Sequence, residues 1–537
     1  MTDNIEESKH TEESKKTSLK KSAEKLTEEI QSMANYKSLY TEIQKLVAST
    51  AVKREDFKNT LLDALKSNGL ETEIRNTVFH WVRSQGSLSA ASESTTNEVD
   101  LTYLKKAQIQ WERRIQKSLN STCNELNVPL ARIRPNADRE ELAEKWNELS
   151  TYDIGDLNID LLNKNSNKNI CHNIDLFTPQ KTSWIDELNW EFSHIEIRVK
   201  TLMQLRCLYV ELAKGMPLLG VNPDMPSSEN FANLEEERIY IGEKILKSNH
   251  APIAQEFLKR GAPRALRGRL WSLVLGSAVK QNDLEYYEEL KNMVLQYDIV
   301  IDKLIIKDVQ LTARNDDQYF VFEDVLYKTM LCFSRDSEVL APVTTDRSAG
   351  GQVIHAVLQG KPATLENTLV FPPSGVIPFH GFTMYATPFC YLYDDPCAMY
   401  YTFRAFYLRY WFRLHTVSSH EQGIVALCLL FERLLQCHEP LLWIHFRNIH
   451  IQPIRIVFKW IMRGFSGHLP PEQLLCLWDL ILGYDSLEII PLLAVTILSF
   501  RKENLMQVNN QQSVEAVLAD LSSLKVVPLL QLALLRE

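Results

Sequence analysis

The sequence predicts an all-α fold, and three observations carry that prediction. Apolar residues recur at steps of three and four along most of the chain, which is the period of one helix face. Prolines open the run LPPEQLLCLWDLIL over 469–482, and the first turn of a helix is where proline is best tolerated. The best strand candidate, HIEIRVKTL over 194–202, is short and by itself buries little. Helices therefore dominate the predicted fold.

Composition and charge narrow the class of protein. A chain of 537 residues has room for two to four domains at roughly 100–200 residues each. The net charge of −9 argues against a nucleic-acid partner, because nucleic acids bind basic surfaces. Nine scattered cysteines without a C-x-x-C pair suit a reducing compartment. We therefore expect a cytoplasmic protein.

Hydropathy and the N-terminal sequence give no sign of a membrane protein or a secreted one. The longest uncharged apolar run, IIPLLAVTILSF over 489–500, is well short of the roughly 20 residues of a spanning helix. The first residues, MTDNIEESKHTEESKK, are charged and have no apolar core of a secretory signal. We expect no direct membrane insertion.

The first part of the chain divides into a tail and a helical region. Residues 1–18 have almost nothing apolar to bury and are predicted to be disordered. The region 19–150 is predicted to be helical, with the serine-rich stretch 84–98 as a surface linker. Its clearest amphipathic helix places these residues on one face: Leu104, Ala107, Trp111, Ile115, Leu119, Cys123 and Leu126.

The remainder divides into a linker, a connecting segment and a larger helical domain. Residues 151–183 are rich in Asn and Asp and form a predicted linker, and 184–234 connect it to the next domain. Helical patterns then dominate from 235 to 505, interrupted by one predicted long loop over 342–375. Further C-terminal helices are expected in 506–537 because the spacing of three and four returns there.

Three stretches carry reactive residue types whose spacing favours structural roles. RGAPRALRGRLW, 260–271, holds four arginines, but interleaved apolar residues indicate a buried helix with a polar flank rather than phosphate contacts. CHEPLLWIHFRNIH, 437–450, lacks the regular pair spacing of a zinc site. SSHEQG, 418–423, is no hydrolase triad, because triad partners are rarely sequence neighbours and no G-x-S-x-G elbow exists. A P-loop is also absent.

Several motifs, in this order, resemble the TBC domain, the catalytic module of Rab GTPase-activating proteins. The opening signature of that family is similar to Arg260-Gly261-x-Pro263-x-x-Leu266-Arg267-Gly268-x-x-Trp271. Ile305-x-x-Asp308 lies where the family has I-x-x-D-x-x-R, and PFHGFTMYATPFCYLY over 378–393, which includes Gly381, resembles its Y-x-Q-G-M motif. The back half of the domain is matched by Pro440-Leu441 with His445, Lys459-Trp460, Phe465-Ser466 and Leu477-Trp478-Asp479.

The resemblance implies a reaction in which the chain supplies two side chains to a Rab GTPase in its GTP form. An arginine neutralises charge that develops on the transferred phosphoryl group, and a glutamine positions the attacking water. Such an arginine is worth about 10³–10⁵ in rate. GTP and Mg²⁺ are carried by the partner, so no cofactor of the chain's own is implied.

Both of these positions are altered here. Counting along the motifs places Leu311 at the arginine and His380 at the glutamine. Leucine has no donor and no charge, and a neutral histidine lacks the paired donor and acceptor of an amide. The candidate catalytic residues are therefore His380 and Arg314, which lies about one helical turn beyond Leu311. The alternative for Arg314 is a surface arginine paired with Asp316, Asp317 or Glu323.

Two functions remain open from the sequence. One is a GTPase-activating protein for Rab GTPases with weak or absent activity, recruited to endomembranes through its Rab. The other is a non-catalytic Rab-binding or scaffolding protein in membrane trafficking. Trp271, Trp460, Trp478 and Asp308 are interpreted as framework rather than reactive groups. The N-terminal helices can dock on the larger domain, bind another protein or form coiled-coil contacts.

Overall fold

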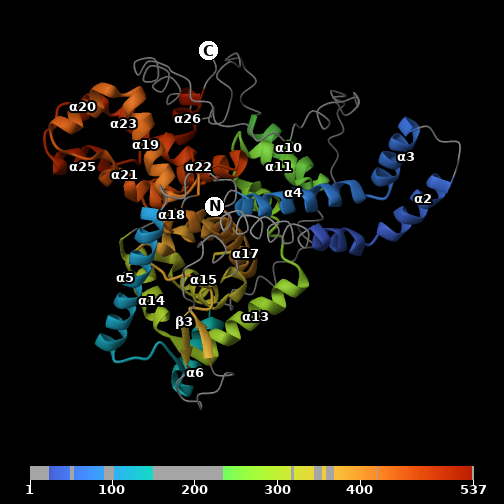
Figure 1. Ribbon diagram of the computed structural model, residues 1–537, viewed down its shortest axis with the longest axis horizontal. Coiled ribbons are helices and arrows are strands. Elements are labelled where there is room, and N and C mark those ends of the chain that lie inside the picture. Colours follow the sequence, from blue (N-terminus) through green and yellow to red (C-terminus); the bar gives the residue numbers. More distant parts are fainter. Residues whose placement is uncertain are drawn as a thin grey trace, which may run out of the picture.

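The computed structural model describes residues 23–48, 54–89, 102–148, 234–315, 320–340, 342–343, 354–357, 368–418 and 420–534. These residues are overwhelmingly helical (Figure 1), which confirms the all-α prediction. The predicted tail at 1–18, the linker at 151–183 and the strand candidate at 194–202 lie outside the described residues.

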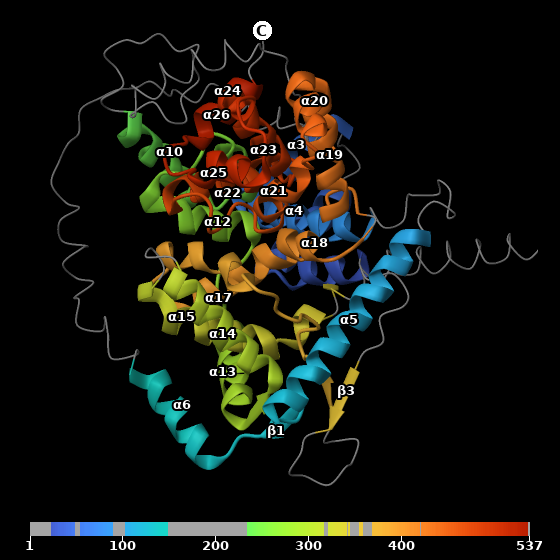
Figure 2. The same cartoon turned by 90° about the vertical axis from the view of Figure 1, so that its left-hand side faces the viewer.

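The N-terminal region contributes a helix over 23–32, five further helices and one short strand. In chain order these are α2 (Tyr36–Ala48), α3 (Arg54–Ser67), α4 (Leu70–Ser89), α5 (Thr102–Leu126), β1 (Ala131–Ile133) and α6 (Asn136–Glu148). Helices α2 and α3 reach away from the body of the molecule, whereas α5 runs along its side (Figures 1 and 2).

The C-terminal part begins at α10 and supplies most of the core. Its α-helices and strands are α10 (Leu234–Ser248), α11 (Ala251–Leu258), α12 (Arg267–Leu275), α13 (Gln281–Gln296), β2 (Tyr297–Ile299), α14 (Val300–Asn315), α15 (Glu323–Arg335), β3 (Ile354–Val357), β4 (Thr368–Phe371), α17 (Pro396–Phe406), α18 (Phe412–His415), α19 (Ile424–His438), α20 (Pro440–Asn448), α21 (Pro453–Met462), α22 (Pro471–Tyr484), α23 (Ile489–Phe500), α24 (Lys502–Leu505), α25 (Gln511–Ala519) and α26 (Val526–Leu534).

Short 3-10 and π turns connect several of these helices. They are η5 (Arg264–Leu266), η6 (Phe320–Phe322), η7 (Ser337–Val339), η9 (Phe382–Tyr385), η10 (Thr387–Tyr391) and η11 (Tyr407–Trp411), the last being a π turn between α17 and α18.

Local sequence explains where many of these helices begin and end. Proline occupies the first turn of α17, α20, α21 and α22, where its missing N–H costs nothing. The carboxylate of Asp395 also accepts hydrogen bonds from the amides of Cys397 and Ala398 at the start of α17. At the other end of a helix, Gly276 stops α12 with a φ of 69°.

A cluster of fully buried aromatic rings lies at the centre of the C-terminal part. The rings of Trp411 and Trp478 are 4.7 Å apart, and Phe406 lies 4.9 Å from Trp411 and 5.5 Å from Trp271. The same core continues past residue 505, because α26 packs on α22 and α23. The predicted boundary at 505 is therefore not a gap in the packing.

One N-terminal helix docks on the C-terminal part through a buried ion pair. Arg83 of α4 lies 3.0 Å from Asp485 at the end of α22, and Arg409 approaches the same carboxylate at 2.6 Å. Burial alone would raise the pKa of Asp485, but the two guanidinium groups hold it well below its usual range. The sequence left open whether the N-terminal helices dock on the larger domain, bind another protein or form coiled-coil contacts. Helix α4 docks on the larger domain.

A strand of the N-terminal region is also tied to the C-terminal part. β1 pairs antiparallel with β2, with Ala131 opposite Ile299 and Ile133 opposite Tyr297. Arg134, just past β1, lies 3.1 Å from Asp302 in the first turn of α14. The pairing fixes the start of α14, the helix that carries Asp308 and Leu311.

Two sequence predictions about irregular segments were wrong in part. Residues 84–89, predicted as linker, continue α4 despite Gly86, and Arg83 anchors the helix to Asp485 directly before this stretch. The predicted loop 342–375 contains β3 and β4, an antiparallel pair with Ile354 opposite Phe371. β-Branched and aromatic residues in both segments favour that pairing, and the side chain of Phe371 is buried.

Candidate functional site

The framework of the site begins with a buried carboxylate, Asp479 of α22. Its oxygens accept hydrogen bonds from the amide of Ala262 at 2.8 Å, from Nε of Arg267 at 3.0 and 3.1 Å, and from Nε1 of Trp271 at 2.6 Å. Asp479 is 0% exposed and Arg267 is 5% exposed. A charge buried this deeply is tolerated because it is paired and hydrogen-bonded.

This network connects the opening motif, through Arg267 and Trp271, to Asp479 of the distant Leu477-Trp478-Asp479 motif. The sequence interpretation placed all four arginines of 260–271 on a polar flank, and that was wrong for Arg267, which points into the core. Arg260, Arg264 and Arg269 are exposed. The side chain of Arg264 pairs with Glu472 at the surface.

The remaining motif residues hold close packing between segments. Gly261 adopts a φ of 78°, a left-handed conformation that glycine adopts without strain. Pro263 precedes η5, and a Cβ at Gly268 would lie 3.0 Å from the carbonyl oxygen of Leu392. Trp460 is buried and stacks on Phe465 with ring centroids 5.6 Å apart. These residues shape the fold around the site.

A second buried carboxylate, Asp308 of α14, holds the segment that carries His380. One oxygen accepts from the amide of Gly381 at 2.5 Å, and the other accepts from the amide and the hydroxyl of Thr383 at 2.8 and 2.6 Å. The side chain of Asp308 is 7% exposed. Asp308 thereby ties the His380 segment to α14, the helix that carries Leu311, although the two segments are far apart in the sequence.

The segment that follows His380 is also anchored from the opposite side. The hydroxyl of Tyr385 donates to the carbonyl of Met462, and the hydroxyl of Ser466 donates to the carbonyl of Met384 at 2.5 Å. Tyr385 stacks on Trp411 at 5.4 Å, and burial raises the pKa of its phenol far above the usual value. Residues 381–385 are thus fixed between α14 and the turn after α21.

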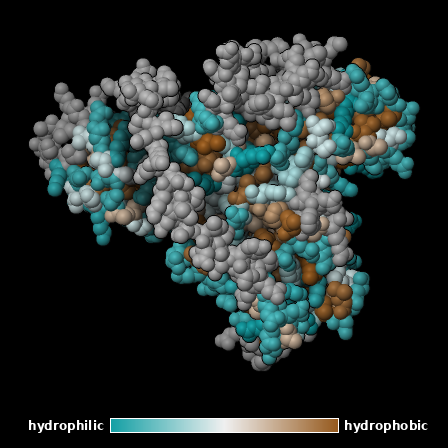
Figure 3. All heavy atoms as spheres, turned by 180° about the vertical axis from the view of Figure 1, so that it is seen from behind, coloured by the Kyte–Doolittle hydropathy of each residue, from teal (hydrophilic) through white to brown (hydrophobic). Residues whose placement is uncertain are grey.

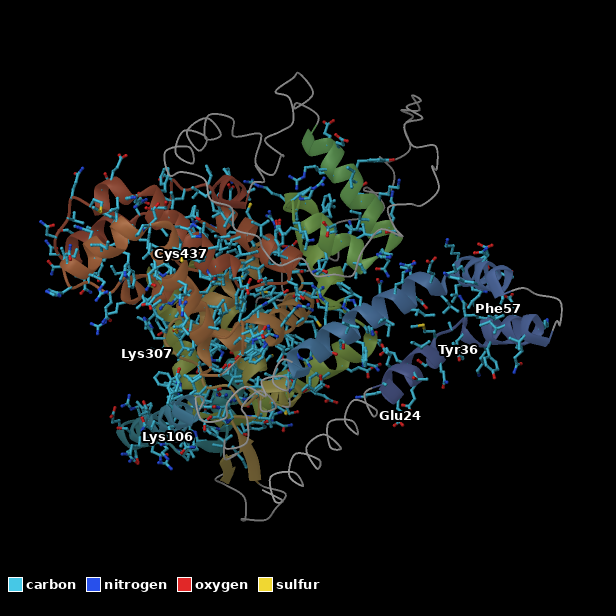
Figure 4. All side chains as sticks on the ribbon, turned by 45° about the horizontal axis from the view of Figure 1, so that its top comes forward. Glu24, Tyr36, Phe57, Lys106, Lys307 and Cys437 are labelled. Atoms are coloured by element: carbon cyan, nitrogen blue, oxygen red, sulfur yellow. The ribbon has the colours of Figure 1, made fainter. Side chains whose placement is uncertain are left out.

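Leu311 lies one turn beyond Asp308 on α14 and is half-buried. Its side chain offers no donor and no charge to this edge. Arg314 lies in the last turn of the same helix, three residues further on and hence on a neighbouring part of the same face. The side chain of Arg314 lies outside the described residues, so its role stays a prediction. The outward face of α14 also carries Lys307, on the same side of the molecule as Lys106 of α5 (Figure 4).

His380 itself projects from the surface, with 70% of its side chain exposed. Its Nδ1 lies 3.7 Å from Oδ1 of Asp308, beyond hydrogen-bond distance. Its carbonyl oxygen accepts a hydrogen bond from Nη2 of Arg463 at 3.3 Å. The ring is therefore available to a partner while its backbone is held.

Arg463 is a residue at this edge that the sequence reasoning missed. It follows α21 directly, in the stretch KWIMRGFS that was matched only through Lys459-Trp460 and Phe465-Ser466. The sequence shows an arginine inside that motif, but it does not show that this arginine lies next to His380. Nearby, burial followed by the charges of Arg463 and Lys459 lowers the pKa of His468 to about 4.

The other reactive stretches form no site among the described residues. No group of three or more His, Cys, Asp or Glu side chains in that part of the chain is placed to hold a metal ion. Nε2 of His445 bonds to the carbonyl of Val508, and Nδ1 of His420 accepts from the amide of Gln422 within its own turn. No described helix combines the length and the apolar character needed to cross a membrane.

The far face of the molecule shows where apolar side chains meet solvent. Figure 3 shows apolar groups at the surface of the lobe that holds α20 and α25. Leu441 and Ile444 of α20 are 62% and 52% exposed. Leu441 and Ile444 lie on α20, whereas the hydrogen bonds that anchor the His380 segment come from α14 and from the turn after α21.

Comparison with known proteins identifies a family model, one related sequence and two solved structures. The Rab-GTPase-TBC domain family matches residues 379–506. TBC1 domain family member 19 of Homo sapiens is 43% identical over 489 residues, which cover 90% of this chain and 91% of the human protein. The Chlamydomonas flagellar RabGAP TBC domain aligns at 15% identity with a TM-score of 0.39, over 64% of this chain and 98% of that one. The Ypt/Rab-GAP domain of Gyp1p aligns at 14% identity with a TM-score of 0.38, over 56% and 97%.

Proposed function

The chain belongs to the TBC1 domain family, with a Rab-GTPase-TBC domain in its C-terminal half, and from that premise we propose that it is a weak GTPase-activating protein for a Rab GTPase in the GTP form. It engages the Rab through the edge formed by α14 and the His380 segment. GTP and Mg²⁺ come with the Rab. The bound Rab also recruits the chain to the endomembrane on which that Rab resides.

One observation supports this proposal above the others: Asp308 clamps the His380 segment against α14. A buried carboxylate satisfied by three donors is a costly arrangement to keep, and here it holds an exposed side chain at a solvent edge. Positioning of this kind is what phosphoryl transfer requires of a protein, because catalysis consists largely of orientation and charge stabilisation.

The side chains at positions 311 and 380 support a low rate of stimulated GTP hydrolysis rather than a high one. With Leu311 at the arginine position, a contribution of about 10³–10⁵ is missing from that residue. The exposed imidazole of His380 can orient a water molecule through one ring nitrogen at a time. We therefore expect a stimulation well below that of a protein with both an arginine and a glutamine.

The second candidate function is a non-catalytic Rab-binding protein. The observation that favours it is the aliphatic side chain of Leu311, which leaves that position without charge. Such a protein would hold a GTP-bound Rab, or assemble other trafficking factors around it, without changing the rate of hydrolysis.

Single-turnover GTP hydrolysis separates the two functions. A panel of Rab GTPases is loaded with GTP and followed with and without a large excess of the full chain, and binding is measured in parallel with a non-hydrolysable GTP analogue. A faster single-exponential decay for at least one Rab supports the activator. Binding with an unchanged decay supports the scaffold, and the absence of both binding and acceleration across the panel rejects both functions.

A further inference from the structure

We propose that Arg463 supplies the positive charge that Leu311 cannot, by placing its guanidinium against the γ-phosphate of the GTP in the bound Rab. The assignment rests on the proposed function and identifies the group that makes a low activity possible. Arg463 comes from the turn after α21, whereas the family's arginine comes from the helix that corresponds to α14. The proposed arginine therefore comes from a different element but lies on the same edge, the one formed by α14 and the His380 segment.

The geometry places Arg463 on the same edge as His380. Its Nη2 donates to the His380 carbonyl at 3.3 Å. Its guanidinium lies against Gly381, where an added Cβ would come within 2.7 Å of Cζ and 2.8 Å of Nε. An added Cβ would displace the guanidinium from this position, and Gly381 also has a φ of 88°, which favours glycine.

The chain of contacts continues from Gly381 to α14. The amide of Gly381 donates to Asp308, and Leu311 follows Asp308 by one helical turn, a rise of about 4.5 Å. Arg463, His380 and Leu311 therefore border one short stretch of surface. A phosphate that approached the family's arginine position would also come within reach of a long, flexible arginine side chain.

The guanidinium of Arg463 is not already neutralised. No carboxylate among the described residues lies within salt-bridge distance of it, and a single backbone carbonyl engages only part of its five-donor fork. Arg267 provides the contrast, because its charge is buried against Asp479 and is unavailable to a partner. Arg463 is half-buried, so part of its side chain stays open to solvent.

The chemistry asked of Arg463 is charge stabilisation during hydrolysis. The oxygen of a water molecule forms a new bond to the γ-phosphorus while the bond to the bridging oxygen of GDP breaks, and the proton of the water ends on the released phosphate. Negative charge shifts towards the bridging oxygen as that bond lengthens. A guanidinium donating to the phosphoryl oxygens is worth more there than in the ground state.

Four variants of the full chain test the assignment with the Rab that responds best. Arg463→Gln keeps a donor for the His380 carbonyl and removes the charge, so it separates catalysis from support of the loop. Arg463→Ala removes both, and Arg463→Lys keeps the charge without the planar fork. Arg455→Ala is the matched control, because Arg455 is an exposed arginine two turns earlier on α21. Thermal unfolding confirms that each variant is folded.

The expected result is a loss of stimulated hydrolysis with binding intact. Arg463→Gln and Arg463→Ala should lower the stimulated rate constant at least about 10-fold, while Arg463→Lys keeps part of it and Arg455→Ala keeps all of it. Affinity for the Rab loaded with a non-hydrolysable analogue should change less than about threefold. If Arg463→Gln hydrolyses like the parent chain, the assignment is wrong even though the chain is an activator. If the parent chain stimulates no Rab, the activator function fails first and this assignment fails with it.

Discussion

Two regions of the molecule hold a buried carboxylate, and they differ in what the carboxylate secures. Asp479 joins Arg267, Trp271 and the amide of Ala262 deep in the core, and every one of those partners is itself buried. Asp308 joins backbone and hydroxyl groups of Gly381 and Thr383, and the side chain next to them, His380, is exposed. Asp479 therefore stabilises the interior of the core, whereas Asp308 positions a segment at the surface.

This difference in burial indicates which motif residues can be substituted without unfolding the protein. Altering Asp479 or Arg267 leaves an unpaired charge in the core, which is strongly destabilising. We expect substitutions at positions 311 and 380 to cost the fold little, because one residue is half-buried and the other faces solvent. That Leu311 and His380 occupy the two reactive positions of the family stays a prediction from the motif spacing.

Breaking the buried network should have the largest effect. Asp479→Ala leaves the Arg267 guanidinium buried without its partner, and we expect a loss of about 3–5 kcal/mol in the free energy of unfolding. Urea denaturation of the full chain measures the loss. Glu472→Ala is the control, because Glu472 pairs with Arg264 at the surface with 64% of its side chain exposed, and it should cost less than about 1 kcal/mol. Equal losses in the two variants would show that the buried Asp479 network stabilises the fold no more than a surface ion pair does.

Restoring the reactive groups should have the next largest effect and should leave the fold unchanged. Leu311→Arg combined with His380→Gln places a charge and an amide on the edge that Asp308 already holds. We expect stimulated hydrolysis to rise about 100-fold, which corresponds to roughly 2.7 kcal/mol of barrier, with the thermal midpoint nearly constant.

The control for this gain adds the same charge to the same helix. Ile306→Arg places an arginine on the outward face of α14, where Ile306 is already 37% exposed, and it should leave the single-turnover rate unchanged. An equal gain from Ile306→Arg would mean that general attraction of the Rab, rather than the finger position, limits the rate.

The smallest effect expected per side chain comes from the protonation of three partly buried histidines. Burial is the main cause that lowers the pKa of His80, His420 and His468 to about 4 each. The unfolded chain binds these protons near pH 6.5 and the folded chain does not, so stability is full above that pH and falls as pH drops from 6.5 towards 4. Between pH 7 and pH 5 we expect a loss on the order of 1 kcal/mol per histidine. Urea denaturation at both pH values measures it.

A variant assigns part of that acid sensitivity to one side chain. His468→Gln removes a group that lies beside Trp460 and near Arg463, and the stability difference between pH 7 and pH 5 should shrink accordingly. An unchanged difference in this variant would show that His468 is protonated equally in both states.

Much of the fold could be predicted from local pattern, and the family resemblance was confirmed. The apolar period identified the helices, since a face repeating at three and four residues can be buried only as a helix. The misses were segments whose structure depends on a distant partner. β3 and β4 stabilise each other only once they are paired, and 84–89 continue a helix that Arg83 anchors to Asp485. Neither partner is visible within a short window of sequence.

By itself the sequence determined the helical class, the motif residues and the identity of the side chains at 311 and 380, because these follow from local periodicity and from residue type. Tertiary structure alone decided that Asp308 clamps the distant His380 segment, and that Arg463 reaches His380 from 83 positions away. The physical reason is that such contacts depend on how helices pack against one another. The packing that brings a guanidinium next to an exposed histidine is set by the whole core and leaves no periodic trace around either residue.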